Sequence, residues 1–330
     1  MIRERWLRLL IGIGFFAGVI VVARHFSEEQ AFVRLARQAN PWWFLVAFLL
    51  QVGTYSTQGE IWRRVGGADG HHLSAWGAYK LALMKLFVDQ ALPSGGFSGS
   101  LIVGRVLDHH AFRRATIFAA AVINTTSFFF AYVISLGVAL TVLFLSGLAT
   151  PLMIILSSVF MAFSAAVAIG LLILTGRDAA ARLGGVGRFF LVRSSLNATR
   201  DADVGIVHNP RIQAEATLFQ FMTFLLDGLT LWALVRSLGV AVSPGHAFAS
   251  FMIANLVRTA GVVPGGLGTF EATAVLMLRM EDISVAAALS ATVLFRVITF
   301  LLPMAPGLWF SRHLLRHRPA HQPVPHRSRA

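Results

Sequence analysis

The sequence predicts an all-α, polytopic integral membrane protein with about six to eight helices. Hydrophobic residues make up 56% of the chain, charged residues make up only 13%, and the mean hydropathy is +0.70. Six apolar stretches are candidates for crossing a bilayer, and two further apolar stretches are interrupted by proline and glycine. This composition excludes an ordinary soluble globular domain, which would carry far more charge.

The uninterrupted apolar segments differ in length. The first is short for a span, but no small-residue cleavage site follows it, which favours a retained helix over a signal peptide. The third is longer than the bilayer core requires, so it predicts a tilted helix or one that extends into the interface. The six segments are residues 9–23, 41–62, 115–146, 151–175, 212–238 and 284–310.

One long polar stretch divides the chain into halves. Residues 176–211 interrupt the apolar pattern and carry several arginines, which predicts a cytoplasmic linker with a helix at the membrane surface. The tail 312–330 is rich in His, Arg and Pro and is expected to be disordered. The sequence thus predicts a single transmembrane domain over residues 1–311, with a first repeat at about 41–175 and a second at about 212–311.

Two apolar segments, 73–104 and 246–280, are broken near their middles by similar motifs. In lipid, the backbone groups freed by such a break have no water to bond, so the break must be buried in protein or line a wet cavity. A pair of breaks in corresponding halves of a membrane protein is a sequence pointer to a transport site. The motifs are LPSGGFSG at 92–99, with Pro93, Gly95 and Gly96, and VPGGLGTFE at 263–271, with Pro264, Gly265 and Gly266.

The distribution of arginine predicts how the chain is oriented. If each broken segment returns to the side from which it enters, nineteen arginines lie on the cytoplasmic side and five on the other. Both termini are then cytoplasmic in a bacterial inner membrane, and the broken segments form re-entrant hairpins of opposite, inverted topology. The net charge of +13 needs no nucleic-acid partner. The alternative is that both broken segments cross the membrane with a kink, which makes eight spans.

Ionisable residues within the apolar segments are candidate site residues, because each costs about 2.5–3.5 kcal/mol at the bilayer centre. They could be paired with one another, or they could bind a substrate. Lys85 and Asp89 are four residues apart and can share a helix face. Glu271 follows the second break at the start of a helix, where a carboxylate suits the helix dipole, so we also expect it to cap that helix. The candidates are Lys80, Lys85, Asp89, Asp227, Arg258, Glu271 and Arg296.

Arginine and glycine in the second broken segment suggest an anion site. A guanidinium binds phosphate in a bidentate manner, which makes Arg258 and Arg296 candidate phosphate ligands. Glycines at the start of a half-helix can expose backbone N–H groups to an anion, although they can equally serve only to make a tight hairpin.

Other chemistry has little support in the sequence. The chain has no cysteine, which excludes disulfides, thiolate metal sites and cysteine nucleophiles. It contains no nucleophile elbow, phosphate-binding loop or zinc-protease helix. We therefore expect no cofactor, no metal and no enzymatic activity, and homo-oligomerisation stays open.

The broken segments and the last span resemble the transmembrane region of lysylphosphatidylglycerol synthases, a flippase-like family of bacterial and archaeal membrane proteins. The likeness is carried by VPGGLGTFEA at 263–272, LFRVITFLLP at 294–303 and ALPSGGFSG at 91–99, with Arg105 downstream. It implies inverted repeats and the transport of a lipid between leaflets, and it places Glu271 and Arg296 at the family's acidic and basic positions. Where many relatives have an acidic residue, this chain has Ser98, Gly99 and Ser100. The soluble aminoacyl-transfer domain of the full synthase is not expected.

Two hypotheses about function follow. In the first, the chain is a flippase-like transporter, and the anionic or aminoacylated headgroup of a membrane lipid enters between the two hairpins while the acyl chains stay in the bilayer. In the second, the chain is an accessory or enzymatic subunit of a membrane-lipid pathway, such as hopanoid or polyprenyl-lipid modification. The lack of a recognisable nucleophile in the sequence favours the first.

Overall fold

The computed structural model describes residues 39–91, 97–175, 201–260, 266 and 268–316, and within these ranges every regular element is helical. This confirms the all-α prediction. The elements are α3 (Pro41–Ala68), α4 (Ala75–Ala91), α5 (Phe97–His109), α6 (Arg114–Leu145), α7 (Pro151–Ile173), α10 (Val204–Val207), α11 (Pro210–Ser237), α12 (Pro244–Ala260), α13 (Thr269–Arg279), α14 (Val285–Arg296), the π-helix η3 (Val297–Leu301) and α15 (Leu302–Arg316).

Four helices in the described residues are long and apolar enough to cross a membrane: α6, α7, α11 and the continuous run from α14 into α15. They match four of the six expected spans closely. The expected span at 41–62 is also a helix, α3, but it falls outside this set because polar residues such as Gln51 and Gln58 lower its hydropathy. The expected span at 9–23 lies outside the described residues. The last helix continues to Arg316, beyond the expected end of the transmembrane domain at residue 311.

Two sets of helices with similar lengths and the same order follow one another along the chain. Helices α3 and α11 have 28 residues each, and both begin at an Asn-Pro pair whose asparagine side chain caps the first turn. Helices α4 and α12 have 17 residues each, and the shorter α5 and α13 follow them. A long helical run then completes each set, α6 in the first half and α14–η3–α15 in the second. The structure therefore contains an internal repeat.

The two repeats run in opposite directions. Helices α3 and α11 pack side by side, and the N–H of Asn40 before α3 donates to the carbonyl of Ser237 at the end of α11 over 2.9 Å. At the other end, Arg64 near the end of α3 pairs with Glu215 near the start of α11 at 3.2 Å. The helices are thus antiparallel, as inverted-topology repeats require.

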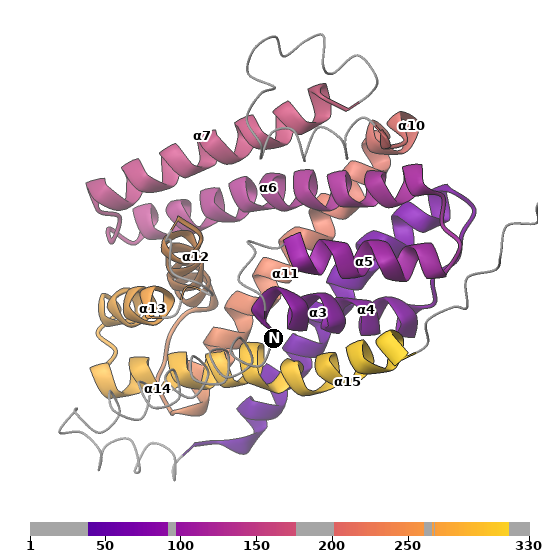
Figure 1. Cartoon of the computed structure of the whole chain (residues 1–330). Coiled ribbons are helices and arrows are strands. Elements are labelled where there is room, and N and C mark those ends of the chain that lie inside the picture. The colour runs from indigo at the N-terminus through magenta and orange to yellow at the C-terminus, as the bar shows by residue number, and fades with distance from the viewer. Residues whose placement is uncertain (1–38, 92–96, 176–200, 261–265, 267, 317–330) are drawn as a thin grey trace, which may run out of the picture.

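The two helical hairpins, α4–α5 and α12–α13, occupy opposite ends of the bundle (Figure 1). The first opens at the end where α3 stops, because Arg113, just after α5, pairs with Asp69, the C-cap of α3. The second opens at the end where α11 stops, because His246 at the start of α12 pairs with Glu281 just after α13 at 2.7 Å. Each hairpin thus begins and finishes at one end of the molecule.

Asp69 joins three elements at the first of these ends. It accepts hydrogen bonds from Arg113 and from the hydroxyl of Thr116 in α6, and Arg113 also reaches Asp203, the N-cap of α10. The bond from Arg113 holds the pKa of Asp69 below its usual value. Asp203 thus has a structural role: it caps α10 and takes part in this ion cluster.

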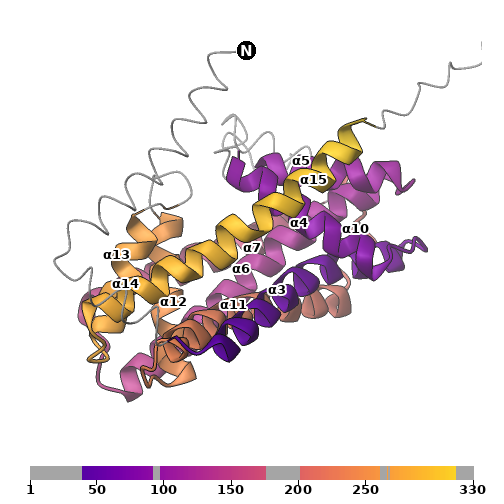
Figure 2. The ribbon, with the colours of Figure 1, turned by 90° about the horizontal axis from the view of Figure 1, so that it is seen from below.

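The core divides in the same way as the repeats. One cluster of buried side chains surrounds α12, α13 and α14, and the other surrounds α4, α5 and the start of α6, with α6 and α11 contributing to both. Helix α7 lies along the outside of α6 (Figure 1), on the side away from α14 and α15, which lie in front in Figure 2. Only 17% of the most apolar window of α7 is buried. The exposed apolar face of α7 is therefore a surface for lipid.

A close helix crossing recurs in both repeats at a glycine. A Cβ at Gly59 in α3 would lie 2.9 Å from the backbone carbonyl of Ala78 in α4, and one at Gly228 in α11 would lie 3.1 Å from the Cα of Phe248 in α12. We expect Gly59→Ala to destabilise the protein by about 1–3 kcal/mol, because a backbone cannot yield as a side chain can. Thermal unfolding of the purified protein in detergent measures this.

The matched control is Gly67→Ala in the same helix, where a Cβ would have nothing within 4 Å. This change should leave the unfolding midpoint unchanged or raise it slightly, since alanine favours the helix. Equal midpoints for the two variants would contradict the close crossing.

Candidate functional site

The structure brings three of the sequence-predicted residues together around the backbone of Gly266. The carbonyl oxygen of Gly266 accepts from the Nη2 of Arg296 at 3.3 Å and from the hydroxyl of Thr269 at 3.0 Å. A Cβ on Gly266 would collide with the side chain of Arg258, and its φ of +62° is one that glycine adopts most easily. We call Arg258, Gly266, Gly268, Glu271 and Arg296 the Gly266 site.

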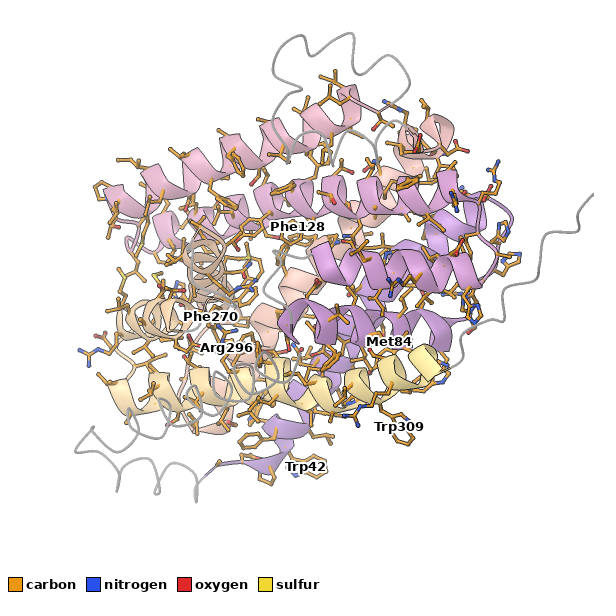
Figure 3. All side chains as sticks on the ribbon, in the orientation of Figure 1. Trp42, Met84, Phe128, Phe270, Arg296 and Trp309 are labelled. Carbon is orange, nitrogen blue, oxygen red and sulfur yellow. The ribbon has the colours of Figure 1, made fainter. Side chains whose placement is uncertain are left out.

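Glu271 holds two of these groups in place. Its Oε2 accepts from the backbone N–H of Gly268 at 2.6 Å, which caps α13, and its Oε1 pairs with the Nε of Arg296 at 2.6 Å. The two side chains are only 17% and 12% exposed. The Arg296 guanidinium also lies 4.6 Å from the ring centroid of Phe270, and Figure 3 shows these two side chains together. The expected cap at Glu271 is confirmed.

Arg258 stands in a different environment. Its Nε and Nη2 both donate to the side-chain oxygen of Asn255, at 2.9 and 2.6 Å. Among the described residues, no carboxylate oxygen lies within the 4.0 Å of an ion pair with Arg258. Arg258 is therefore a cation whose direct partner, within the described residues, is neutral.

Asp227 lies in a neighbouring group of polar side chains between α3 and α11. Its Oδ1 accepts from the Nε2 of Gln51 at 2.8 Å and from the hydroxyl of Thr54 at 3.3 Å. The same Gln51 nitrogen reaches the hydroxyl of Thr230 at 3.0 Å. The hydrogen bonds stabilise this carboxylate at the interface between the two repeats.

The first hairpin uses the same chemistry with other residues. Asp89 pairs with Lys85 at 2.8 Å and its Oδ1 accepts from the backbone N–H of Gly99 at the same distance. In both hairpins a carboxylate thus binds a backbone N–H beside the break and is neutralised by a cation. These two N–H groups are occupied by protein, so they are not the open anion sites that the glycines suggested. Pro93, Gly95, Gly96, Pro264 and Gly265 lie outside the described residues.

A π-helix directly follows Arg296 and was not foreseen. Residues Val297–Leu301 form η3 in the middle of the last span, and the hydroxyl of Tyr55 donates to the carbonyl of Thr299 over 3.5 Å. The equivalent helix of the first repeat, α6, has no such interruption. Since π-helical turns are often found at functional sites, this asymmetry singles out the second repeat.

Two pockets lie outside the Gly266 site. One, of about 160 Å³, is polar and lies at the end of α3, lined by Glu60, Arg63, Arg64, His72 and Leu73. The other, of about 660 Å³, is a largely apolar groove between α6, α7 and α11, lined by residues such as Ile134, Ala165 and Leu218. Neither lining includes a residue of the Gly266 site.

Several contacts in this region could not be found from spacing along the chain. Arg296 and Glu271 are 25 residues apart, and Gln51 and Asp227 are 176 apart. The internal repeat, in contrast, could have been found in the sequence, because the same Asn-Pro pair occurs at 40–41 and at 209–210. Within the described residues, no group of three His, Asp or Glu side chains is arranged to hold a metal ion.

Comparison with known proteins agrees with this architecture. The family profile described as the lysylphosphatidylglycerol synthase TM region matches residues 6–307. A UPF0104 membrane protein of Methanocaldococcus jannaschii is 22% identical over 301 residues, which cover 83% of this chain and 85% of the relative. A second UPF0104 membrane protein, from Methanothermobacter thermautotrophicus, is 22% identical over 329 residues, covering 91% of this chain and 92% of the relative. The chain is therefore a multi-pass membrane protein and belongs to the lysylphosphatidylglycerol synthase TM region family.

Proposed function

We propose that this protein moves a membrane lipid with an anionic or aminoacylated headgroup between the leaflets of a bacterial inner membrane, with both termini in the cytoplasm. The main support is Arg258, a cation among apolar helices whose direct partner among the described residues is the neutral Asn255. A charge is costly in such a place unless it is paired. A phosphate that enters the site would supply the missing negative charge.

The geometry supports different roles for the two arginines. Arg296 forms an ion pair with Glu271 and donates a hydrogen bond to the Gly266 carbonyl, so it holds the end of the hairpin together. Arg258 uses two of its nitrogens on one neutral oxygen, and its remaining N–H groups are suited to phosphate oxygens. In this proposal Arg258 holds the phosphate directly and Arg296 positions the hairpin.

The inverted repeats give a physical route for alternating access. In this proposal α4–α5 and α12–α13 are re-entrant hairpins that open to opposite sides of the membrane, and rocking one repeat against the other exposes the Gly266 site to each side in turn. The polar pocket beside Arg63 and Arg64 lies at the end where α4–α5 opens, and it would receive the headgroup from the cytoplasmic leaflet. The acyl chains would remain in the bilayer beside the exposed apolar helices.

Leaflet exchange of labelled lipids in proteoliposomes tests the proposal. The intact protein should exchange a phospholipid faster than empty vesicles do, and Glu271→Gln and Arg296→Ala should each slow the exchange. The slowing is expected because each change disrupts the pair that fixes the hairpin. Equal exchange by all three proteins and by empty vesicles would refute transport.

A further inference from the structure

A serine, a histidine and a glutamate meet at the end of the bundle where α12–α13 opens. The Oγ of Ser146 lies 2.5 Å from the Nε2 of His246, and the Nδ1 of His246 lies 2.7 Å from the Oε2 of Glu281. Each ring nitrogen of the histidine thus has one partner, a hydroxyl on one side and a carboxylate on the other. This is the order of contacts that activates a serine nucleophile.

We propose that Ser146, His246 and Glu281 form a second site, which hydrolyses carboxylic esters at the membrane surface. Neither the family match nor lipid exchange requires this site. It supplies the nucleophile whose absence from the sequence counted against an enzymatic role. The three residues come from three separate regions, so no sequence motif joins them.

Each residue is held by its own local structure. Ser146 is the C-cap of α6, where its hydroxyl also lies 2.8 Å from the carbonyl of Val142. His246 lies in the first turn of α12, and the hydroxyl of Ser243 accepts from its backbone N–H at 3.1 Å. Glu281 follows α13 in a tight turn in which Asp282 has a φ of +59°. The contacts among the three side chains therefore do not depend on a single mobile loop.

The surroundings suit an amphipathic ester. Ser146 is exposed, whereas His246 and Glu281 are 24% and 14% exposed, so the nucleophile is accessible and the other two are sheltered. Phe144 and Leu145, immediately before Ser146, are 72% and 80% exposed. Apolar side chains beside the nucleophile would contact the acyl chain of the substrate.

The reaction balances with an ester and water as the two reactants. Ser146 gives its proton to the Nε2 of His246 as its Oγ bonds to the ester carbon, and the alcohol leaves with that proton as the C–O bond breaks. Water then attacks the acyl-serine, with His246 first accepting its proton and then returning one to Ser146, and a carboxylic acid is released. The N–H of Gly245, the second residue of α12, has no acceptor within the helix and is suited to stabilise the oxyanion.

The test uses the purified full chain in lipid nanodiscs. A fluorophosphonate probe should label Ser146, as shown by peptide mass mapping, and p-nitrophenyl butyrate should be hydrolysed. Ser146→Ala and His246→Ala should each lower the rate by about 100-fold or more. Glu281→Gln should lower kcat and leave KM unchanged, because Glu281 positions the histidine without touching the ester.

The matched control is Ser56→Ala. Ser56 is also exposed, and its hydroxyl bonds to the carbonyl four residues earlier, that of Val52, but no histidine in the described part of the chain bonds to it. This variant should retain full ester hydrolysis. If the wild-type protein is not labelled at Ser146 and hydrolyses the ester no faster than Ser146→Ala, the proposal is overturned and the three residues only tie α6 to the second hairpin. Labelling of the wild type needs no variant to fold.

Discussion

Replacing Arg258 with glutamine is expected to slow lipid exchange by about 10- to 100-fold while the protein stays folded. Hydrogen bonds to a charged group contribute about 1.5–3 kcal/mol, which corresponds to that range in affinity. This change breaks no ion pair among the described residues, because the direct partner of Arg258 there is the neutral Asn255. Exchange rates in proteoliposomes, with circular dichroism to check helical content, measure both parts of this prediction.

Arg279→Gln is the matched control for this experiment. Arg279 lies in the last turn of α13, is exposed, and carries the same charge in the same repeat. Its replacement should leave exchange within about twofold, since exposed charges contribute little. If the two variants exchange lipid at the same rate, Arg258 does not bind the headgroup.

Removal of one partner from the Glu271–Arg296 pair is expected to have the largest effect on stability. Both side chains are mostly buried, and breaking a buried pair leaves an uncompensated charge, which costs about 3–5 kcal/mol. Arg296→Met and Glu271→Gln should therefore each lower the unfolding midpoint markedly. Arg296→Met should cost more of the two, because methionine has no donor for Glu271, whereas glutamine at position 271 keeps an oxygen that can accept from Gly268 and Arg296.

The double variant Glu271→Gln with Arg296→Met gives the sharper result. It removes both charges, so its loss of stability should be well below the sum of the two single losses, with an interaction free energy of about 1–3 kcal/mol. Thermal unfolding of the four proteins in detergent completes this cycle. Strictly additive losses would show that the two side chains do not stabilise one another.

The sequence was most informative where local physical chemistry decides the structure. The expected span 115–146 is the helix Arg114–Leu145, and the expected 151–175 is Pro151–Ile173, because an apolar run of bilayer length has no better conformation in lipid. The Lys85–Asp89 pair followed from helical spacing, and the cap at Glu271 from its place at the start of a helix. These interactions lie within one turn of a helix.

Contacts between distant parts of the chain could not be predicted in this way. Which side chain becomes the partner of Arg258 depends on where the carboxylates lie after folding, and Glu271 pairs with Arg296 instead. The approach of Ser146 to His246 and Glu281 depends on how three helix ends meet. The antiparallel packing of α3 on α11 decides which residues share an end of the bundle, and no local pattern encodes that choice.

The most direct measurement of the central claim is cross-linking by a phospholipid that carries a photoreactive group in its headgroup. After illumination in proteoliposomes, mass mapping should find adducts on α12 and α13 around Asn255, Arg258 and Glu271. Excess unlabelled phospholipid should compete for these adducts, and Arg258→Gln should lose them. Adducts confined to the lipid-facing helix α7 in both proteins would contradict a headgroup site at Gly266.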